Sequence, residues 1–304
     1  MNSDSTKYLI SIVGPTAIGK TALSIKLAQH FNTEIISADS RQFFKEMSIG
    51  TAVPNEEELA GAKHHFIQHK SIEDPYSVGT FEKDAIQCLE SLFKTHDVVI
   101  LVGGSGLYTD AIINGLDDFP DVDPKIRSQL NDKLNAEGLE TLQEQLKALD
   151  PASYETIAID NPHRVIRALE ISIGTGKPYS TFLNRKRTSR NFEVITIGLN
   201  AERETIYDRI NRRVDIMISE GLLDEAKKLF PRRHLNALNT VGYKELFNYF
   251  DNEWSLEFAI SEIKKNTRRF AKRQLTWYRK NDNIIWFDYL TDTKTIIDRI
   301  NEIT

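Results

Sequence analysis

The sequence has very little cysteine and no long apolar run. Cys88 is the one cysteine among 304 residues, so no disulfide can form within the chain, and a reducing cytoplasm is the expected compartment. No Cys/His group has the spacing of a zinc site. No apolar stretch approaches the roughly 20 residues of a membrane-spanning helix. We therefore expect a cytoplasmic protein that has no membrane partner.

An overall excess of basic charge is also absent, since the formal net charge is −5. Any surface that binds nucleic acid would have to be a local cluster of Lys and Arg. Hydrophobic residues make up 40% of the chain and charged residues 27%, which is typical of a globular protein. The length allows one large domain, or one domain that carries an insertion.

A complete phosphate-loop motif, GPTAIGKT, occupies residues 14–21. An apolar, β-branched run at residues 8–13 precedes it. Leu23, Leu27 and Phe31 follow it at the spacing of one helix face. The pattern predicts a strand, a glycine loop and a helix, which is the context in which this motif binds phosphate.

The chemistry of this loop follows from its backbone and from two side chains. Its N–H groups and the helix N-terminus would bind a phosphate or diphosphate. Lys20 adds a positive charge, and the Thr21 hydroxyl is a ligand for Mg²⁺. The motif alone does not distinguish a diphosphate from the phosphates of a bound nucleotide such as ATP. The residues expected to bind the phosphates are Gly14, Pro15, Thr16, Ala17, Ile18, Gly19, Lys20 and Thr21.

Two further strands are expected to end near this loop. Residues 33–40 predict a short strand that ends at Asp39 and Ser40, and residues 97–102 predict a strand buried on both faces. Ligands bind beyond the carboxyl ends of parallel strands, so Asp39 and Ser40 should lie near the phosphate loop. The alternative role for Asp39 is to cap the N-terminus of a helix. The glycine-rich turn at 103–108 is a second place where backbone is expected to meet a ligand.

The composition changes after residue 117. Residues 118–190 are polar and helical in pattern, with no strong strand candidate, and residues 192–199 return to strand character. We predict an α/β fold, in which a phosphate-loop-type parallel sheet is flanked by helices. The catalytic core would comprise residues 1–117 and 191–304, and residues 118–190 would form a helical insertion domain.

The C-terminal third predicts helices, two of which carry notable basic residues. Arg209 and Arg213 share a face of a helix at 206–218, although spacing alone favours a solvated arginine stripe. In residues 264–280, eight of seventeen are basic and none is acidic, with aromatic residues interleaved. That pattern suits a nucleic-acid backbone with bases alongside. A solvated basic face is the alternative.

Together these motifs resemble the tRNA dimethylallyltransferase (tRNA isopentenyltransferase) family. The resemblance implies transfer of the dimethylallyl group of dimethylallyl diphosphate to the exocyclic amine of the adenosine just 3′ of the anticodon. It also implies a Mg²⁺ cofactor. The expected partner is the anticodon stem-loop of tRNA, and the enzyme is expected to be a monomer. The matching stretches follow the family order along nearly the whole chain and are residues 14–21, 37–42, 103–108, 163–170, 241–245 and 267–277.

Individual residues take roles from this resemblance. Asp39 matches the family's general base, and Thr16, Lys20 and Arg213 match residues that bind or neutralise the diphosphate. Thr21 would hold the metal. The insertion domain would contact tRNA. The positions that match tRNA contacts are Asp39, Ser40, Arg41, Gln42, Ser105, Arg127, His163, Arg164, Arg167, Gly242, Lys272, Arg273 and Arg279.

The sequence also departs from the family pattern. Phe44 stands where Tyr is usual, Val53 stands where Lys is usual, and Ser105 replaces a common Thr while keeping the hydroxyl. Because Val53 removes a positive charge, we leave residues 51–54 out of the expected site.

Two other functions remain open on the residues alone. One is a phosphate-loop kinase that acts on a small metabolite, and the other is a non-catalytic, nucleotide-dependent RNA-binding protein. The kinase would explain residues 14–21 but would leave the basic segment at 264–280 without a role.

Overall fold

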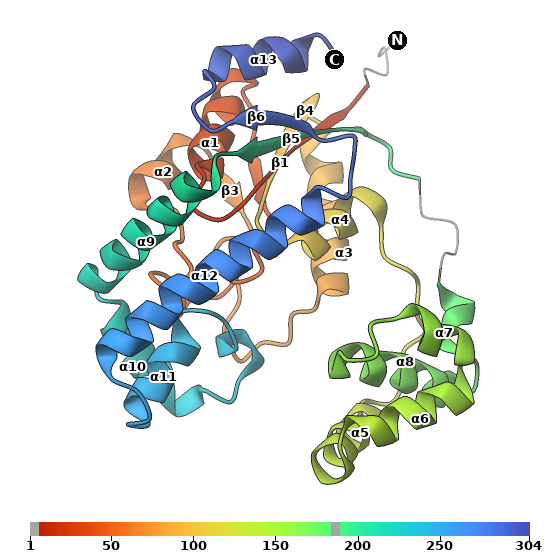
Figure 1. Ribbon diagram of the computed structural model, residues 1–304. Helices are drawn as coiled ribbons and strands as arrows, with labels where there is room; N and C mark the ends of the chain where they lie inside the picture. Colours follow the sequence, from red (N-terminus) through yellow and green to blue (C-terminus); the bar gives the residue numbers. More distant parts are fainter. Residues whose placement is uncertain (1–5, 184–188) are drawn as a thin grey trace. The chain divides into compact units, whose positions relative to one another are not determined.

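The computed structural model describes residues 6–183 and 189–304. The chain divides into two compact units, one made of the residues up to Asn114 and from Arg190 onward, the other of Gly115–Ser189. Among the described residues, no helix combines the length and the apolar character needed to cross a bilayer. Each unit has its own hydrophobic core and is described by itself (Figure 1).

The first unit is built on a six-stranded sheet in which every strand pair is parallel. The strand order is β3-β2-β4-β1-β5-β6, which confirms the expected parallel α/β fold. Ile10 on the central strand faces Ile100 on one neighbour and Ile195 on the other. The strands are β1 (Tyr8–Val13), β2 (Ile35–Ser37), β3 (His64–His65), β4 (Val98–Val102), β5 (Glu193–Asn200) and β6 (Ile285–Asp288).

Helices cover both faces of this sheet. Alternate side chains of a strand point to opposite faces, so a strand that is apolar throughout needs a packed layer on each side. Ile10 and Ile100 join a core with α1, α9 and α13, whereas Leu9 and Val99 join a separate core with α3 and α4. The helices of this unit are α1 (Lys20–His30), α2 (Glu56–Gly61), α3 (Val78–Leu92), α4 (Gly106–Asn114), α9 (Arg203–Ser219), α10 (Leu222–Leu229), α11 (Tyr243–Phe250), α12 (Leu256–Tyr278) and α13 (Thr293–Asn301).

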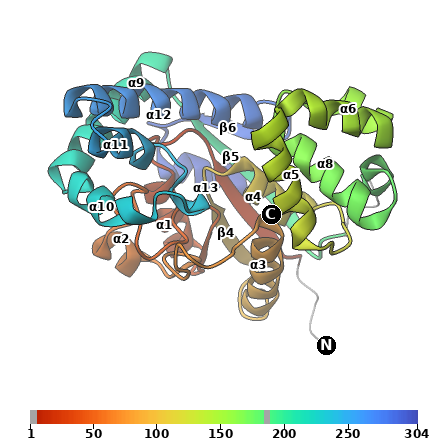
Figure 2. The same ribbon diagram turned by 90° about the horizontal axis from the view of Figure 1, so that it is seen from below.

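A third core lies away from the sheet, where α10 and α11 pack between the ends of α9 and α12. Its buried members include Val214, Leu222, Tyr243, Leu246 and Ile263. In Figures 1 and 2 the long helix α12 runs beside α9 along its length. This packing holds α9 and α12 side by side, which matters because both helices carry residues of the site.

The second unit is helical, and no strand occurs in its described part. Asn161 caps α8 and accepts a hydrogen bond from the His163 N–H at 3.0 Å. The buried Asp150 carboxylate caps α7 through Ser153 and accepts two hydrogen bonds from Ser180. The elements of this unit are α5 (Pro124–Glu137), α6 (Leu139–Leu149), α7 (Pro151–Thr156), α8 (Pro162–Thr175) and the 3₁₀ helix η1 (Tyr179–Phe182).

Candidate active site

The phosphate loop closes over the carboxyl end of β1 in a left-handed backbone path. Gly14, Ala17 and Gly19 have φ values of 140°, 63° and 110°. At Gly14 a side chain is also excluded by packing, because a Cβ there would lie 2.4 Å from the carbonyl oxygen of Leu199 on β5. The loop leads into α1, whose first N–H groups have no intrahelical partner. The segment therefore presents the backbone donors of an anion site.

Lys20 is folded back onto this loop. Its Nζ donates to the carbonyl oxygens of Gly14 at 3.1 Å and Pro15 at 2.8 Å. Burial lowers the pKa of Lys20 to about 8; the Asp39 carboxylate opposes this shift and the Arg213 guanidinium adds to it. A diphosphate bound to the loop would bring negative charge to the ammonium and favour its charged form.

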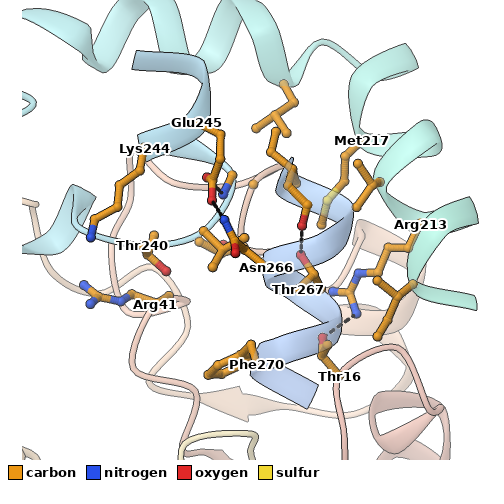
Figure 3. A pocket seen from close by; sticks show the side chains of 18 of the residues that line it. Thr16, Arg41, Arg213, Met217, Thr240, Lys244, Glu245, Asn266, Thr267 and Phe270 are labelled. Carbon is orange, nitrogen blue, oxygen red and sulfur yellow. Dashed lines mark hydrogen bonds between the residues drawn. The ribbon is translucent and has the colours of Figure 1, made fainter. Parts of the chain in front are cut away.

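A cavity of ≈ 520 Å³ lies beside the phosphate loop. Thr16 from the phosphate loop, Asp39 from the loop after β2, Ser105 from the turn after β4 and Arg213 from α9 all line it. Figure 3 shows Arg213 reaching Thr16 at one end of the cavity. The structure thus brings Thr16, Asp39 and Arg213 together, and Lys20 is close enough to both charged groups for its pKa to respond to them.

Asp39 sits in a turn and caps no helix. Its Oδ1 accepts from the Arg41 N–H at 3.2 Å, and its main-chain oxygen accepts from the Gln42 N–H at 3.0 Å. The next helix along the chain is α2, which Asn55 caps, so the helix-cap alternative for Asp39 is wrong. The turn leaves Oδ2 beside Gly104, with no hydrogen-bond partner for it among the described side chains.

Arg209 and Arg213 do not form a solvated stripe, so that interpretation of the α9 spacing is wrong. Both are half-buried. Arg209 Nε donates to the Ala17 carbonyl oxygen at 2.7 Å, and Arg213 Nη1 donates to Thr16 Oγ1 at 3.4 Å. Burial lowers the pKa of Arg213, whereas Asp39 raises it; an arginine nevertheless stays charged at neutral pH. One arginine supports the loop, and the other faces its cavity.

The remaining residues of the 39–42 segment differ in what they contact. Ser40 and Ser105 pair through their hydroxyls at 3.1 Å, and both line the cavity. The Arg41 guanidinium donates to carbonyl oxygens in residues 236–239 while its side chain lines the same cavity. Gln42 is buried, and its amide holds the carbonyl oxygens of residues 51 and 52. Gln42 is therefore a support of the neighbouring loop.

The second glycine turn is filled by the protein itself. A Cβ added to Gly103, Gly104 or Gly106 would lie 2.5–2.7 Å from Ala38, Gln274 or Trp277, respectively. Packing within the protein therefore accounts for the three glycines, and the expectation that backbone meets a ligand at this turn stays a prediction. Its glycines allow α12 and the β2 loop to pack closely against it, and Ser105 is its member that lines the cavity.

Some basic residues of α12 have partners on α9, and others are exposed to solvent. Lys264 pairs with Asp215 at 2.6 Å and Arg268 with Asn211 at 2.7 Å, both on α9. Lys272, Arg273 and Arg279 are exposed. Gly242 lies outside this helix but lines the cavity, with a φ of 99° and its N–H donated to the buried Glu245 carboxylate.

The second unit holds four of the expected tRNA contacts. Arg127 and Arg167 share the buried Glu170 carboxylate at 3.7 and 2.9 Å. Arg167 also lies over the Phe119 ring, 5.2 Å from its centroid. His163 and Arg164 are exposed in the first turn of α8. This unit therefore presents four basic or titratable side chains, two of which are oriented by one carboxylate.

The described residues offer few side chains that could bind a metal ion. Among the described residues, no group of three or more His, Cys, Asp and Glu side chains could hold an ion. Thr21 lies in the first turn of α1, next to Lys20. Mg²⁺ commonly takes one or two protein ligands and completes its shell with water and phosphate oxygens. One hydroxyl at this place fits a Mg²⁺–diphosphate complex and does not fit a stand-alone metal centre.

Two site residues, Arg209 and Gln274, were missed from the sequence. Gln274 is buried in α12 and contacts both glycine loops. The available signal was its position on the inner face of the helix, between the buried Ala271 and Tyr278. The density of basic residues around it drew attention to the outer face.

The loop at 48–50 is held against the site by Glu225. Its carboxylate accepts from the N–H groups of residues 48, 49 and 50 at 2.8–3.0 Å and from the Tyr243 hydroxyl at 2.7 Å. We expect Glu225→Gln to lower the free energy of unfolding by ~1–3 kcal/mol, because the amide nitrogen would face donors that then lack an acceptor. Urea denaturation measures this. Glu90→Gln, at an exposed position of α3, is the control, and equal losses in the two variants would contradict the prediction.

Comparison with known proteins places these features in a family context. The family model described as IPP transferase matches residues 42–281. A tRNA dimethylallyltransferase of Christiangramia forsetii is 65% identical over 97% of this chain and 98% of its own length. Another of Flavobacterium johnsoniae is 61% identical, over 97% of this chain and 98% of its own length.

Solved structures are similar as well. The crystal structure of a tRNA isopentenylpyrophosphate transferase from Bacillus halodurans matches with a TM-score of 0.72 and 41% identity, over 98% of this chain and 95% of that one. A eukaryotic dimethylallyltransferase, solved in crystallographic snapshots of its action on tRNA, matches with a TM-score of 0.85 and 27% identity. The match covers 98% of this chain and 79% of that one.

Proposed function

The chain belongs to the IPP transferase family, and from this membership we infer that its activity is that of a tRNA dimethylallyltransferase. It transfers the dimethylallyl group of dimethylallyl diphosphate to the exocyclic amine of the adenosine 3′-adjacent to the anticodon and releases diphosphate. The observation that supports this chemistry best is that Asp39, the phosphate-loop residue Thr16 and Arg213 line one cavity.

In the proposed reaction, the allylic C–O bond breaks and its electron pair leaves with the diphosphate. Backbone N–H groups of the loop, Lys20 and Arg213 stabilise the negative charge that develops there. The amine nitrogen of adenosine bonds to the allylic carbon and gives up a proton, which Asp39 accepts. Thr16 orients Arg213 through its hydroxyl. Mg²⁺ bound to the diphosphate and to Thr21 would neutralise further charge when present.

The acceptor base has to leave the stack of the anticodon loop to reach this cavity. The cavity volume of ≈ 520 Å³ lies in the range of small-molecule sites, about 300–1,000 Å³. Phe270, 37% exposed, lines the cavity from α12 and offers an aromatic face for base stacking. Ser40, Arg41, Ser105 and Gly242 line the same cavity and are the proposed contacts nearest the base.

We also propose that the exposed residues Lys272, Arg273 and Arg279 bind tRNA phosphates, and that Arg127, His163, Arg164 and Arg167 do so from the second unit. We further propose a monomeric enzyme. A cytoplasmic location follows from the tRNA substrate. Gln42 would act on tRNA indirectly, through the loop that its amide holds.

Neutralising the exposed basic residues of α12 should change the salt dependence of tRNA binding. We expect Lys272→Gln, Arg273→Gln and Arg279→Gln each to reduce the slope of log K against log [salt] by about 1, because each removes one phosphate contact. Filter binding at several salt concentrations measures the slope. Lys264→Gln is the matched control, since Lys264 pairs with Asp215; a slope change equal to the control would argue against these contacts.

The activity is tested by nucleoside mass spectrometry of tRNA incubated with dimethylallyl diphosphate, with and without the protein. We expect a five-carbon mass gain on one adenosine, and it should require the protein. Release of γ-phosphate from ATP, without that gain, would instead favour the kinase or the nucleotide-dependent RNA-binding protein. The matched relatives carry transferase names, so the comparisons give those alternatives no support.

A further inference from the structure

Helix α12 has an inner face that touches both glycine loops of the site. On this face Gln274 is 5% exposed. Its Oε1 accepts from the Thr16 N–H at 2.8 Å, and its Nε2 donates to the Gly104 carbonyl oxygen at 2.8 Å. One amide therefore joins the phosphate loop after β1 to the glycine turn after β4.

One of the two loops that Gln274 joins is the proposed diphosphate-binding loop, and the other packs against the loop after β2 that carries Asp39. Thr16 holds the Arg213 guanidinium on the diphosphate side. On the other side, Gly104 lies beside the Asp39 carboxylate, and the next residue, Ser105, is hydrogen-bonded to Ser40. A change in the spacing of these two loops would therefore change the spacing between the diphosphate site and the Asp39 carboxylate.

The amide also has little freedom to move. A Cβ on Gly104 would lie 2.5 Å from Gln274 Nε2, so the glycine and the amide are in close contact. One helical turn further on, the Tyr278 hydroxyl donates to the Gly103 carbonyl oxygen at 3.4 Å. A buried amide whose oxygen and nitrogen are both hydrogen-bonded is held in a single orientation.

We propose that Gln274 is a positioning residue that sets the spacing between the bound diphosphate and the Asp39 carboxylate. This inference rests on the proposed function. It requires an amide at position 274, because the Thr16 N–H needs an acceptor and the Gly104 carbonyl oxygen needs a donor. A carboxylate supplies only the acceptor, and a thioether of similar length supplies neither reliably.

The test compares Gln274→Glu with the wild-type protein over a range of pH. In the carboxylate form, the Glu variant lacks the donor to Gly104 and places a negative charge near the diphosphate. We expect kcat to fall by about 10- to 100-fold, the size of loss that misplaced reacting groups produce. In its protonated form the carboxyl again has one donor and one acceptor, so the deficit should shrink as the pH falls.

The charged and titratable groups around this position include Asp39, Asp110, Lys20, Arg213 and Tyr278. Since the wild-type protein carries the same groups, the ratio of the two kcat values at each pH isolates the contribution of position 274. Gln274→Met, which titrates nothing, should lose activity by the same factor at every pH. Ser261→Ala, exposed in the first half of the same helix, is the control for α12 and should match the wild type.

Affinity for tRNA should stay within about twofold of the wild type in all three variants, because no phosphate contact changes. Wild-type kcat in both Gln274 variants would overturn the proposal, and so would a deficit in Gln274→Glu that does not change with pH. Calorimetric titration with inorganic pyrophosphate provides a separate readout, in which we expect both Gln274 variants to bind more weakly. If the wild-type protein transferred no dimethylallyl group, the proposed function would fall, and these pyrophosphate affinities would still decide the role of Gln274.

Discussion

Replacing Asp39 by asparagine is expected to slow dimethylallyl transfer by about 10²- to 10⁴-fold, the usual contribution of a general base. The amide has nearly the shape of the carboxylate but cannot take the proton that the adenosine amine releases. Its side-chain oxygen can still accept from the Arg41 N–H, so the turn at residues 39–42 should survive. Single-turnover measurement of product on tRNA gives the rate directly.

The control for this variant is its affinity for inorganic pyrophosphate. Asp39 favours the charged form of Lys20, so its loss should lower the pKa of that lysine further. Measurements well below pH 8 keep the ammonium protonated and separate the two effects. Near-wild-type turnover by Asp39→Asn, with intact pyrophosphate binding, would rule out Asp39 as the base.

Replacing Arg213 by glutamine is expected to reduce kcat by about 10²- to 10³-fold, as removal of a donor aimed at developing charge does elsewhere. The guanidinium is half-buried at the cavity, and its partner is the hydroxyl of Thr16. A neutral amide at this place stabilises the departing diphosphate far less than a cation does. Initial rates with varied dimethylallyl diphosphate separate kcat from KM.

Arg212→Gln is the matched control, because Arg212 is the neighbouring arginine on α9 and its exposed side chain pairs with Asp208 at 2.6 Å. It should behave as the wild type. If the two variants lost the same activity, Arg213 would be a structural residue of α9 with no part in stabilising the leaving group.

The elements with strong local patterns could be predicted from the sequence. The apolar run of β1 and the buried run of β4 match the strands found at Tyr8–Val13 and Val98–Val102. Residues 50–80 have no such pattern, yet they contain α2 and the two-residue strand β3. Strand β3 exists because it pairs with β2 and because His65 bonds Glu34 at 2.6 Å. The two residues of β3 contain no sequence pattern from which its pairing with β2 or its contact with Glu34 could be predicted.

Helix α12 shows the same limit. It begins at Leu256, well before the basic segment, because Ser255 caps it. The basic residues drew attention to the outer face, while the inner face is defined by what it meets from the rest of the chain. For the same reason, the glycine-rich turn at 103–108 suggested a ligand, although Gln274 and Trp277 occupy the space beside it.

The candidate site divides in a similar way. Thr16, Asp39 and Arg213 were expected from motifs, and the structure brings them to one cavity. Arg209 and Gln274 act through hydrogen bonds to the phosphate loop that span 192 and 258 positions of the chain. Contacts at that separation depend on the folded topology, and a single sequence carries no local trace of them.

The contact between Gln274 and the glycine turn spans 170 positions, which has a consequence for how the enzyme is made. On the ribosome, the phosphate loop and β4 emerge long before α12. Domains fold as their segments leave the exit tunnel, yet the space beside Gly104 and Gly106 stays unfilled until residues 274 and 277 arrive. A nascent chain that has already exposed its anion-binding motif would therefore remain catalytically incompetent until residues 274 and 277 have left the ribosome.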